Sequence, residues 1–208
     1  MNKILIIIVA IIATCAGAIG FHFLTKKPLP EHALYYKQSR GLANFQLVDQ
    51  AGKPFTNQKL RGKWSFVFFG YTSCPDVCPT TLQNLSFIYE ELQEIDENSQ
   101  VLLVSVDPKR DSQSKLAQYI AYFNEDFLAL RAEHDKLYPF ARNLGLMYAI
   151  SDDGKSEAYQ VDHSASLALI NPDAKIAAIF KAEQAVGEVP SIDSDKLLAD
   201  YQRIVALY

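Results

Sequence analysis

Hydrophobic residues of this chain fall into runs whose spacing predicts alternating strands and helices. "KWSFVFFGY" (63–71) and "VLLVSVDP" (101–108) are continuous apolar runs, which are typical of buried strands at the centre of a sheet. Between them, "PTTLQNLSFIYEELQEI" (79–95) repeats apolar residues every three or four positions, which predicts an amphipathic helix that begins at Pro79. A second helix, "DSQSKLAQYIAYF" (111–123), is predicted after the second strand.

Further elements complete the order. The remaining predicted elements are two short strands around a glycine turn (45–56), a shorter helix interrupted by proline (135–148), a hairpin (166–180) and a C-terminal helix (193–208). The order strand, helix, strand, helix, hairpin, helix joins a parallel βαβ unit to an antiparallel ββα unit. The pattern therefore predicts an α/β protein with a thioredoxin-like fold, in which helices flank a mixed central sheet.

The N-terminal segment differs from the rest of the chain. Residues 4–24 contain no Asp, Glu, Lys or Arg and would extend about 30 Å as a helix, which is enough to cross a bilayer. We therefore expect residues 1–24 to form a single-pass transmembrane helix, a cleaved signal segment being the alternative because residues 16–18 read "AGA". Residues 25–41 are predicted to be a linker, and residues 42–208 the folded domain.

Composition and the absence of certain signals set the expected location. Of the 208 residues, 49% are hydrophobic and 21% are charged, which is typical of a globular protein, and the net charge of −4 gives no reason to expect a nucleic-acid partner. No Arg-rich transit segment precedes the apolar run, which favours a bacterial chain. The prediction is an inner-membrane protein whose domain lies in the periplasm, where cysteines can form disulfides.

Two of the three cysteines mark the candidate site. Cys74 and Cys78 lie in "FFGYTSCPDVCPTTL" (68–82), between the first buried strand and the first helix, and a proline follows each of them. The start of a helix stabilises thiolate over thiol, and both metal binding and thiol chemistry require the thiolate. A disulfide that closes so short a loop stabilises a fold only weakly, so this pair is better suited to a bond that opens and closes.

His163 is the third candidate, 85 residues after Cys78. It precedes the predicted hairpin, whose start faces the cysteine loop in a thioredoxin-like topology. Two thiolates and one imidazole can form a three-coordinate site, in which the thiolates favour Cu(I) and the imidazole also accommodates Cu(II). Zinc would need a fourth ligand in a structural site, although two cysteines, one histidine and water form a known catalytic arrangement. Asp162 is a candidate to orient the imidazole, although neighbours in a strand point to opposite sides.

Three blocks carry a resemblance to a known family. "GKWSFVFFGYTSCPDVCPTTL", "VSVDPKRDS" and "VDHSASLALINPDAK" resemble, in this order, the signature blocks of the SCO/SenC family, membrane-anchored proteins needed to assemble cytochrome c oxidase. The resemblance covers about residues 45–180 and implies a thioredoxin-like fold with a copper site formed by Cys74, Cys78 and His163. It also implies that the protein delivers copper to the binuclear copper centre of the oxidase, or keeps the cysteines of that centre reduced.

These two functions are the main alternatives, and they do not exclude each other. A copper metallochaperone would act on the copper-receiving subunit of the oxidase, whereas a thiol:disulfide oxidoreductase would exchange disulfides with it. Another periplasmic copper chaperone or a thioredoxin-like reductant is a further expected partner. Residues 155–171 contain no proline, whereas thioredoxins place a cis-proline there, and a histidine in that place favours metal binding over general disulfide exchange. We therefore expect a metal-binding protein rather than a classical enzyme, with thiol:disulfide oxidoreductase activity as the alternative. A peroxiredoxin-like peroxidase is less well supported, because Thr72 and Arg131 are not at recognisable positions for it.

Overall fold

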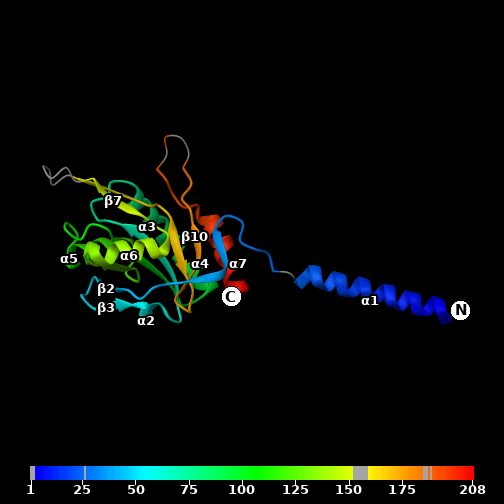
Figure 1. Ribbon diagram of the computed structural model, residues 1–208. Coiled ribbons are helices and arrows are strands. Elements are labelled where there is room, and N and C mark those ends of the chain that lie inside the picture. Colours follow the sequence, from blue (N-terminus) through cyan, green and yellow to red (C-terminus); the bar gives the residue numbers. More distant parts are fainter. Residues whose placement is uncertain (1–2, 26, 152–158, 185–186, 188) are drawn as a thin grey trace.

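A computed structural model describes residues 3–25, 27–151, 159–184, 187 and 189–208. Figure 1 shows the N-terminal helix α1 (Lys3–Thr25) projecting from a folded domain that holds all other elements. Within the described part of the chain, no helix combines the length and the apolar character that crossing a membrane requires. Residues 1–2 of the predicted anchor and residue 26 of the predicted linker lie outside the described residues.

An eight-stranded sheet forms the centre of the domain. From one edge to the other its strands are β1 (Leu34–Gly41), β10 (Lys175–Phe180), β9 (Leu167–Ile170), β4 (Trp64–Gly70), β5 (Ser99–Ser105), β6 (Leu128–Arg131), β2 (Gln46–Asp49) and β3 (Pro54–Thr56). Neighbours β4, β5 and β6 run parallel, and the other pairs are antiparallel. Every residue of β4 and β5 is buried, so both predicted central strands are confirmed.

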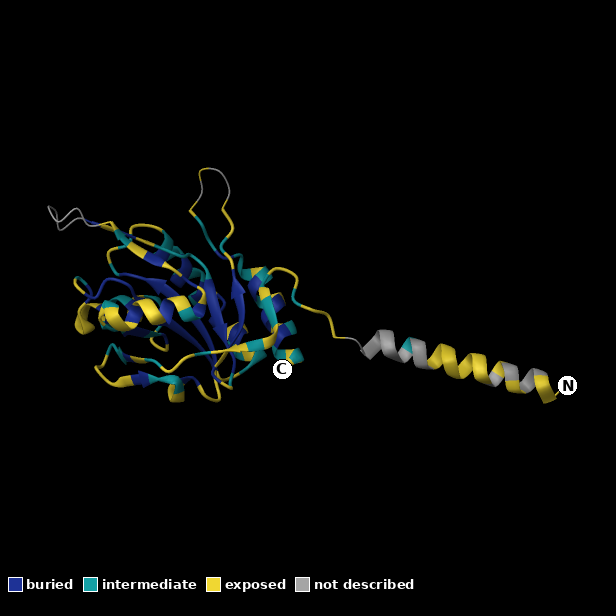
Figure 2. Ribbon diagram, viewed as in Figure 1, coloured by how far each residue is buried: buried dark blue, intermediate teal, exposed yellow. Residues whose placement is uncertain are grey.

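Helices cover both faces of this sheet. They are α2 (Asn57–Leu60), α3 (Val77–Phe87), α4 (Tyr89–Ile95), α5 (Gln113–Phe123), α6 (His134–Leu144) and α7 (Ser194–Leu207). Side chains alternate between the two faces of a sheet along each strand. In β4, the ring centroid of Phe66 lies 4.9 Å from that of Tyr201 in α7. The ring centroid of Phe69, on the other face, lies 6.0 Å from that of Phe140 in α6. Helices α6 and α7 therefore lie on opposite faces, with the buried sheet between them (Figure 2). The predicted α/β class with a mixed central sheet is confirmed.

The first helix after β4 differs from the sequence prediction. It begins at Val77 rather than at Pro79, and a break at Ile88 divides the predicted helix into α3 and α4. Pro79 is thus the third residue of α3, a position where its missing N–H costs no helical hydrogen bond. Cys78 therefore belongs to the first turn of the helix and not to the loop that precedes it.

The boundary of the predicted linker also needs correction. Residues 34–41 form β1, which pairs with β10 at the edge of the sheet. Just before it, the buried carboxylate of Asp200 accepts hydrogen bonds from the backbone N–H groups of residues 31–33, at 2.6 to 2.8 Å. The register of β1 shifts between Tyr35 and Arg40, so this strand lacks the strict alternation that would reveal it in the sequence. The domain therefore begins near residue 31.

Candidate metal centre

The two cysteines lie where the central strand β4 leads into α3. Cys78 is 0% exposed, whereas Cys74 in the preceding loop is half-buried. The backbone N–H of Cys78 points at the sulfur of Cys74, 3.4 Å away. Gly70 at the end of β4 permits this packing, because a Cβ atom there would lie only 2.9 Å from the sulfur of Cys78. The end of the strand and the start of the helix thus fix both sulfur atoms.

His163 reaches the cysteines from outside the main sheet. It ends β8 (Gln160–His163), which pairs with β7 (Tyr148–Ser151) in a separate two-stranded sheet, with Tyr148 directly opposite His163. The chain then turns into β9, next to β4, and this turn carries the imidazole to the cysteine loop. The structure confirms the expectation that this part of the chain faces the loop after β4.

Neighbouring groups hold the imidazole of His163 in one orientation. Its ring meets the rings of Phe68 and Tyr71 edge to face, with centroids 5.7 and 5.9 Å away. Its Nδ1 atom lies 3.2 Å from the carbonyl oxygen of Ser164, which can only accept, so Nδ1 carries the proton in this hydrogen bond. The lone pair of Nε2 is then free to face the sulfur atoms, as a metal ligand requires.

The spacing of the three side chains fits one metal ion. The Nε2 atom of His163 lies 3.2 Å from the sulfur of Cys78 and 3.9 Å from that of Cys74, and all three ligand atoms lie within 4.8 Å of one another. With metal–sulfur bonds of about 2.3 Å and metal–nitrogen bonds of about 2.0 Å, a planar three-coordinate site would place nitrogen and sulfur about 3.7 Å apart. The two observed nitrogen–sulfur distances, 3.2 and 3.9 Å, lie on either side of that value. The three residues singled out from the sequence are therefore brought together, and the third cysteine, Cys15, lies in α1 and outside this group.

The two thiols differ in ionisation. The pKa of Cys74 is lowered, first because the Cys78 side chain hydrogen-bonds to its sulfur, and further because of the neighbouring His163 side chain and the backbone N–H of Cys78. Burial raises the pKa of Cys78, and the neighbouring Cys74 raises it further. Cys74 is therefore the thiolate of the pair and Cys78 the thiol. The start of the helix favours thiolate at Cys74, as expected, whereas burial outweighs this effect at Cys78.

Asp162 does not orient the imidazole. It is exposed and accepts a hydrogen bond from Ser151 at 3.4 Å, while the carbonyl group of Ser164 holds His163. The two side chains point to opposite sides of β8, as alternation in a strand requires.

A network behind Tyr71 was not predicted from the sequence. The guanidinium group of Arg110 lies 3.8 Å from the ring centre of Tyr159 and 5.4 Å from that of Tyr71, and it forms an ion pair with buried Asp107. The hydroxyl group of Tyr159 donates to Asp107 at 2.5 Å. Arg110 thus packs against Tyr71, whose ring contacts the imidazole of His163. The sequence did contain a signal for this network. Asp107 follows β5, which runs parallel to β4, and parallel strands end at the same edge of a sheet, so Asp107 was to be expected near the cysteine loop.

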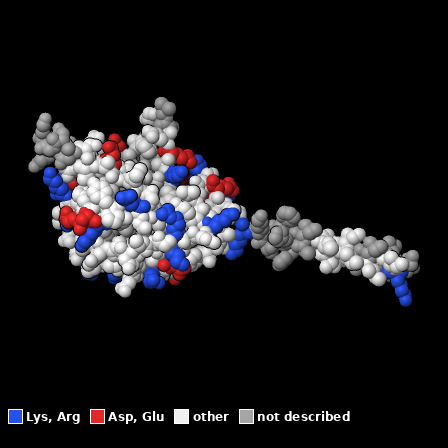
Figure 3. Space-filling model, in the orientation of Figure 1, with Lys and Arg blue, Asp and Glu red and all other residues white. Residues whose placement is uncertain are grey.

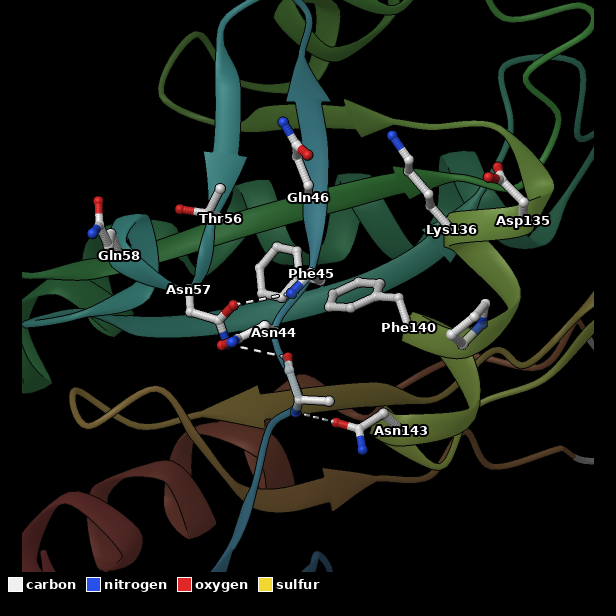
Figure 4. A pocket seen from close by; sticks show the side chains of 12 residues that line it. Asn44, Phe45, Gln46, Thr56, Asn57, Gln58, Asp135, Lys136, Phe140 and Asn143 are labelled. Atoms are coloured by element: carbon white, nitrogen blue, oxygen red, sulfur yellow. Dashed lines mark hydrogen bonds between the residues drawn. The ribbon is translucent and has the colours of Figure 1, made fainter.

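A groove of about 730 Å³ lies away from this centre, between α6 and the start of β2 (Figure 4). Its lining contains no cysteine or histidine. Two of its amides hold the chain that enters β2: Asn57 accepts from the N–H of Phe45 at 3.1 Å, and Asn143 from that of Ala43 at 2.9 Å. The rings of Phe45 and Phe140 pack against each other at a tilt, with their centroids 4.5 Å apart. These contacts give two of the polar side chains that line the groove a structural role.

The surface charges are mixed. Figure 3 shows Lys and Arg interspersed with Asp and Glu on the face that it presents. This face therefore carries no extended patch of one sign.

Comparisons with known proteins agree with the geometry. The SCO1/SenC family model matches residues 35–192. The chain is 31% identical over 192 residues to an SCO2-like protein of Rickettsia prowazekii, which covers 91% of this chain and 94% of that protein. Among solved structures it is similar to copper-bound ScoI of Arabidopsis thaliana (TM-score 0.70, 26% identity, 80% of this chain and 98% of the other). It is also similar to copper-bound yeast Sco1 (TM-score 0.65, 27% identity, covering 78% of this chain and 88% of the other). The chain therefore belongs to the SCO1/SenC family.

Proposed function

We propose that this protein binds one copper ion through Cys74, Cys78 and His163 and delivers it to the binuclear copper centre of cytochrome c oxidase during assembly of that enzyme. The observation that carries the proposal is the meeting of two sulfur atoms and one imidazole nitrogen within 4.8 Å. This donor set suits copper in both oxidation states. Copper-bound relatives from a plant and from yeast support the choice of metal, and the resemblance to the SCO/SenC family implies the oxidase.

Exposure of the ligands suggests how copper leaves. Cys74 is half-buried and reachable from solvent, whereas Cys78 is fully buried. An incoming thiolate of the partner would therefore replace Cys74 first, forming one copper–sulfur bond as another breaks. Copper would then pass to the partner by successive ligand exchange, without being released into solvent.

Thiol:disulfide exchange is the second candidate, and the different ionisation of the two cysteines favours it. The Cys74 thiolate would attack a disulfide of the partner, and Cys78 would then attack the mixed disulfide and release the partner as a dithiol. The partner gains two electrons, and Cys74 and Cys78 become a disulfide. The same pair of sulfur atoms therefore serves either function.

A transfer experiment tests the proposal. The domain from residue 28 onward is loaded with copper and mixed with the copper-receiving domain of the oxidase, in one sample with reduced cysteines and in another with a disulfide. We expect one copper ion per chain before mixing and transfer to the reduced receiver. A domain that binds no copper contradicts the proposal, and thiol exchange with the oxidised receiver without metal transfer supports the second candidate instead.

Attachment to the inner membrane through residues 4–24, with the domain in the periplasm, stays a prediction. Its support is the uncharged apolar run in the sequence. Extraction of membranes at alkaline pH checks it, since an anchored chain stays in the pellet. Release of the full-length chain into the supernatant would contradict the anchor.

A further inference from the structure

Behind the cysteine loop lies a second buried carboxylate, which is not one of the three candidate metal ligands. Asp111 is 0% exposed and lies just before α5. It accepts hydrogen bonds from the backbone N–H of Thr72 at 3.1 Å, from the hydroxyl group of Thr72 at 2.5 Å and from that of Ser105 at 2.7 Å. Three donors thus converge on two oxygen atoms, which a carboxylate satisfies and an amide cannot. Through Asp111, the end of β5 is tied to the loop.

Lys115, in the first turn of α5, extends this support. Its ammonium group lies 3.8 Å from Asp111 and donates a hydrogen bond to the hydroxyl group of Ser73 at 3.2 Å. Thr72 and Ser73 are the two residues immediately before Cys74, so both are held from the side of α5. The next residue, Cys74, donates its backbone N–H to the carbonyl oxygen of Tyr71 at 3.2 Å, and its sulfur accepts from the N–H of Cys78 at 3.4 Å. At the other end of this chain of contacts, Asp111 is fully enclosed by the protein.

We propose that Asp111 is a positioning residue of the metal centre: it holds Thr72 directly and Ser73 through Lys115, and so keeps the sulfur of Cys74 within reach of Cys78 and His163. This inference rests on the proposed copper site. Residues that only support a metal ligand typically contribute about 10- to 100-fold to metal affinity. Without this support the loop would be held only by the hydrogen bond from the Cys74 N–H to the carbonyl oxygen of Tyr71 and by the contacts of Cys78, and the sulfur of Cys74 could move away from the other two ligands.

Asp111→Asn is the first variant, because asparagine has the same shape and still accepts from the N–H of Thr72 while losing the ion pair with Lys115. The matched control is Asp200→Asn. Asp200 is also 0% exposed and accepts from backbone N–H groups, but it holds residues 31–33 against α7, away from the cysteine loop. Both variants remove a buried negative charge and lower the melting temperature.

Two measurements separate positioning from stability. We expect Asp111→Asn to weaken Cu(II) binding by about 10- to 100-fold in a chelator competition and to shift the thiolate-to-copper absorption band, whereas Asp200→Asn changes neither. In the metal-free chain, Asp111→Asn should also disfavour the disulfide between Cys74 and Cys78 in an equilibrium with glutathione, because this disulfide requires the two sulfurs to be held together. Thr72→Val keeps the bond between Ser105 and Asp111 and should change both measurements in the same direction by a smaller factor.

Each outcome has one meaning. If Asp111→Asn and Thr72→Val fold and retain the parent affinity, absorption band and disulfide equilibrium, the positioning role is overturned. Equal effects of Asp111→Asn and Asp200→Asn also overturn it, because they would indicate loss of stability alone. If the parent chain binds no copper, the proposed function fails, and the glutathione equilibrium still decides the role of Asp111. If Asp111→Asn does not fold, Thr72→Val decides it.

Discussion

The proposed metal centre joins two regions that are built differently. The cysteines lie where β4 leads into α3, and β4 is a central strand of the eight-stranded sheet. All residues of β4 and of its neighbour β5 are buried. His163 ends a strand of a separate two-stranded sheet, and this sheet is attached through aromatic side chains: Tyr148 stacks on Phe69 at 6.4 Å and on Tyr138 at 4.6 Å. The core thus fixes the sulfur atoms, while a peripheral element brings the imidazole to them.

This difference divides the ligands by function. The sulfur pair is enough to retain a soft ion, since thiolates select Cu(I). The imidazole adds the ligand that makes Cu(II) acceptable, and its position depends on a small sheet rather than on the core. The contribution of each region can therefore be separated by comparing the two oxidation states of copper.

The largest difference between the two oxidation states of copper is expected at the peripheral region. His163→Ala should weaken Cu(II) binding by more than about 100-fold, because it removes a ligand rather than a residue that only supports one, and it should weaken Cu(I) by about tenfold or less. Competition with a chelator specific for each oxidation state measures both affinities. In the core region the variant for comparison is Cys78→Ser, which should abolish the binding of both Cu(I) and Cu(II).

His134→Ala is the matched control for this variant. His134 also contacts the two-stranded sheet, through a hydrogen bond of 2.9 Å between its Nδ1 atom and the hydroxyl group of Tyr148, but it is not one of the three candidate ligands. The His134→Ala variant should lose about 1 kcal/mol of the free energy of unfolding, and its preference between Cu(II) and Cu(I) should be unchanged. Equal weakening of both ions by His163→Ala would contradict the division between the regions.

The same division explains what the sequence could predict. The buried strands and the cysteines share one short segment, and a thioredoxin-like order of elements places residues just before the hairpin at the same loop. His163 was predicted from this topology and not from its immediate neighbours. Strand β1 was missed because its register shift removes the alternating pattern, and the start of α3 was misplaced because proline is tolerated at several positions of a first turn.

Other features depend on contacts that no local pattern encodes. The sequence places Cys74 and Cys78 in equivalent positions, each followed by proline, and does not rank them. Only packing against Gly70 shows that Cys78 is the buried one. Asp111 likewise looks like an ordinary residue before a helix cap, and its role emerges from the close approach of β5, α5 and the loop.

The smallest predicted effect concerns the different ionisation of the two cysteines in the core region: the rate at which Cys74 is alkylated should depend little on pH. Hydrogen bonds, first of all that from the side chain of Cys78, lower the pKa of Cys74 to about 4, so Cys74 stays a thiolate at any pH well above that value. Between pH 7 and pH 5 its rate of alkylation by iodoacetamide should change little, whereas a thiol with the ordinary pKa of about 8.5 would slow by about 100-fold. Alkylation followed by mass spectrometry of the cysteine peptides measures both sites, and Cys78 should stay unmodified while the chain is folded.

Two controls show whether the cysteine pair causes this behaviour. In denaturant both thiols should regain the steep profile of an exposed cysteine. In the folded Cys78→Ala variant the principal donor to Cys74 is gone, so the pKa of Cys74 should rise and its rate should again fall with decreasing pH. A tenfold loss of rate per pH unit at Cys74 in the parent chain would show that its thiolate is not stabilised. The sulfur atom most accessible to a partner would then be a neutral thiol at neutral pH, and the start of copper transfer or disulfide exchange at Cys74 would have to be abandoned.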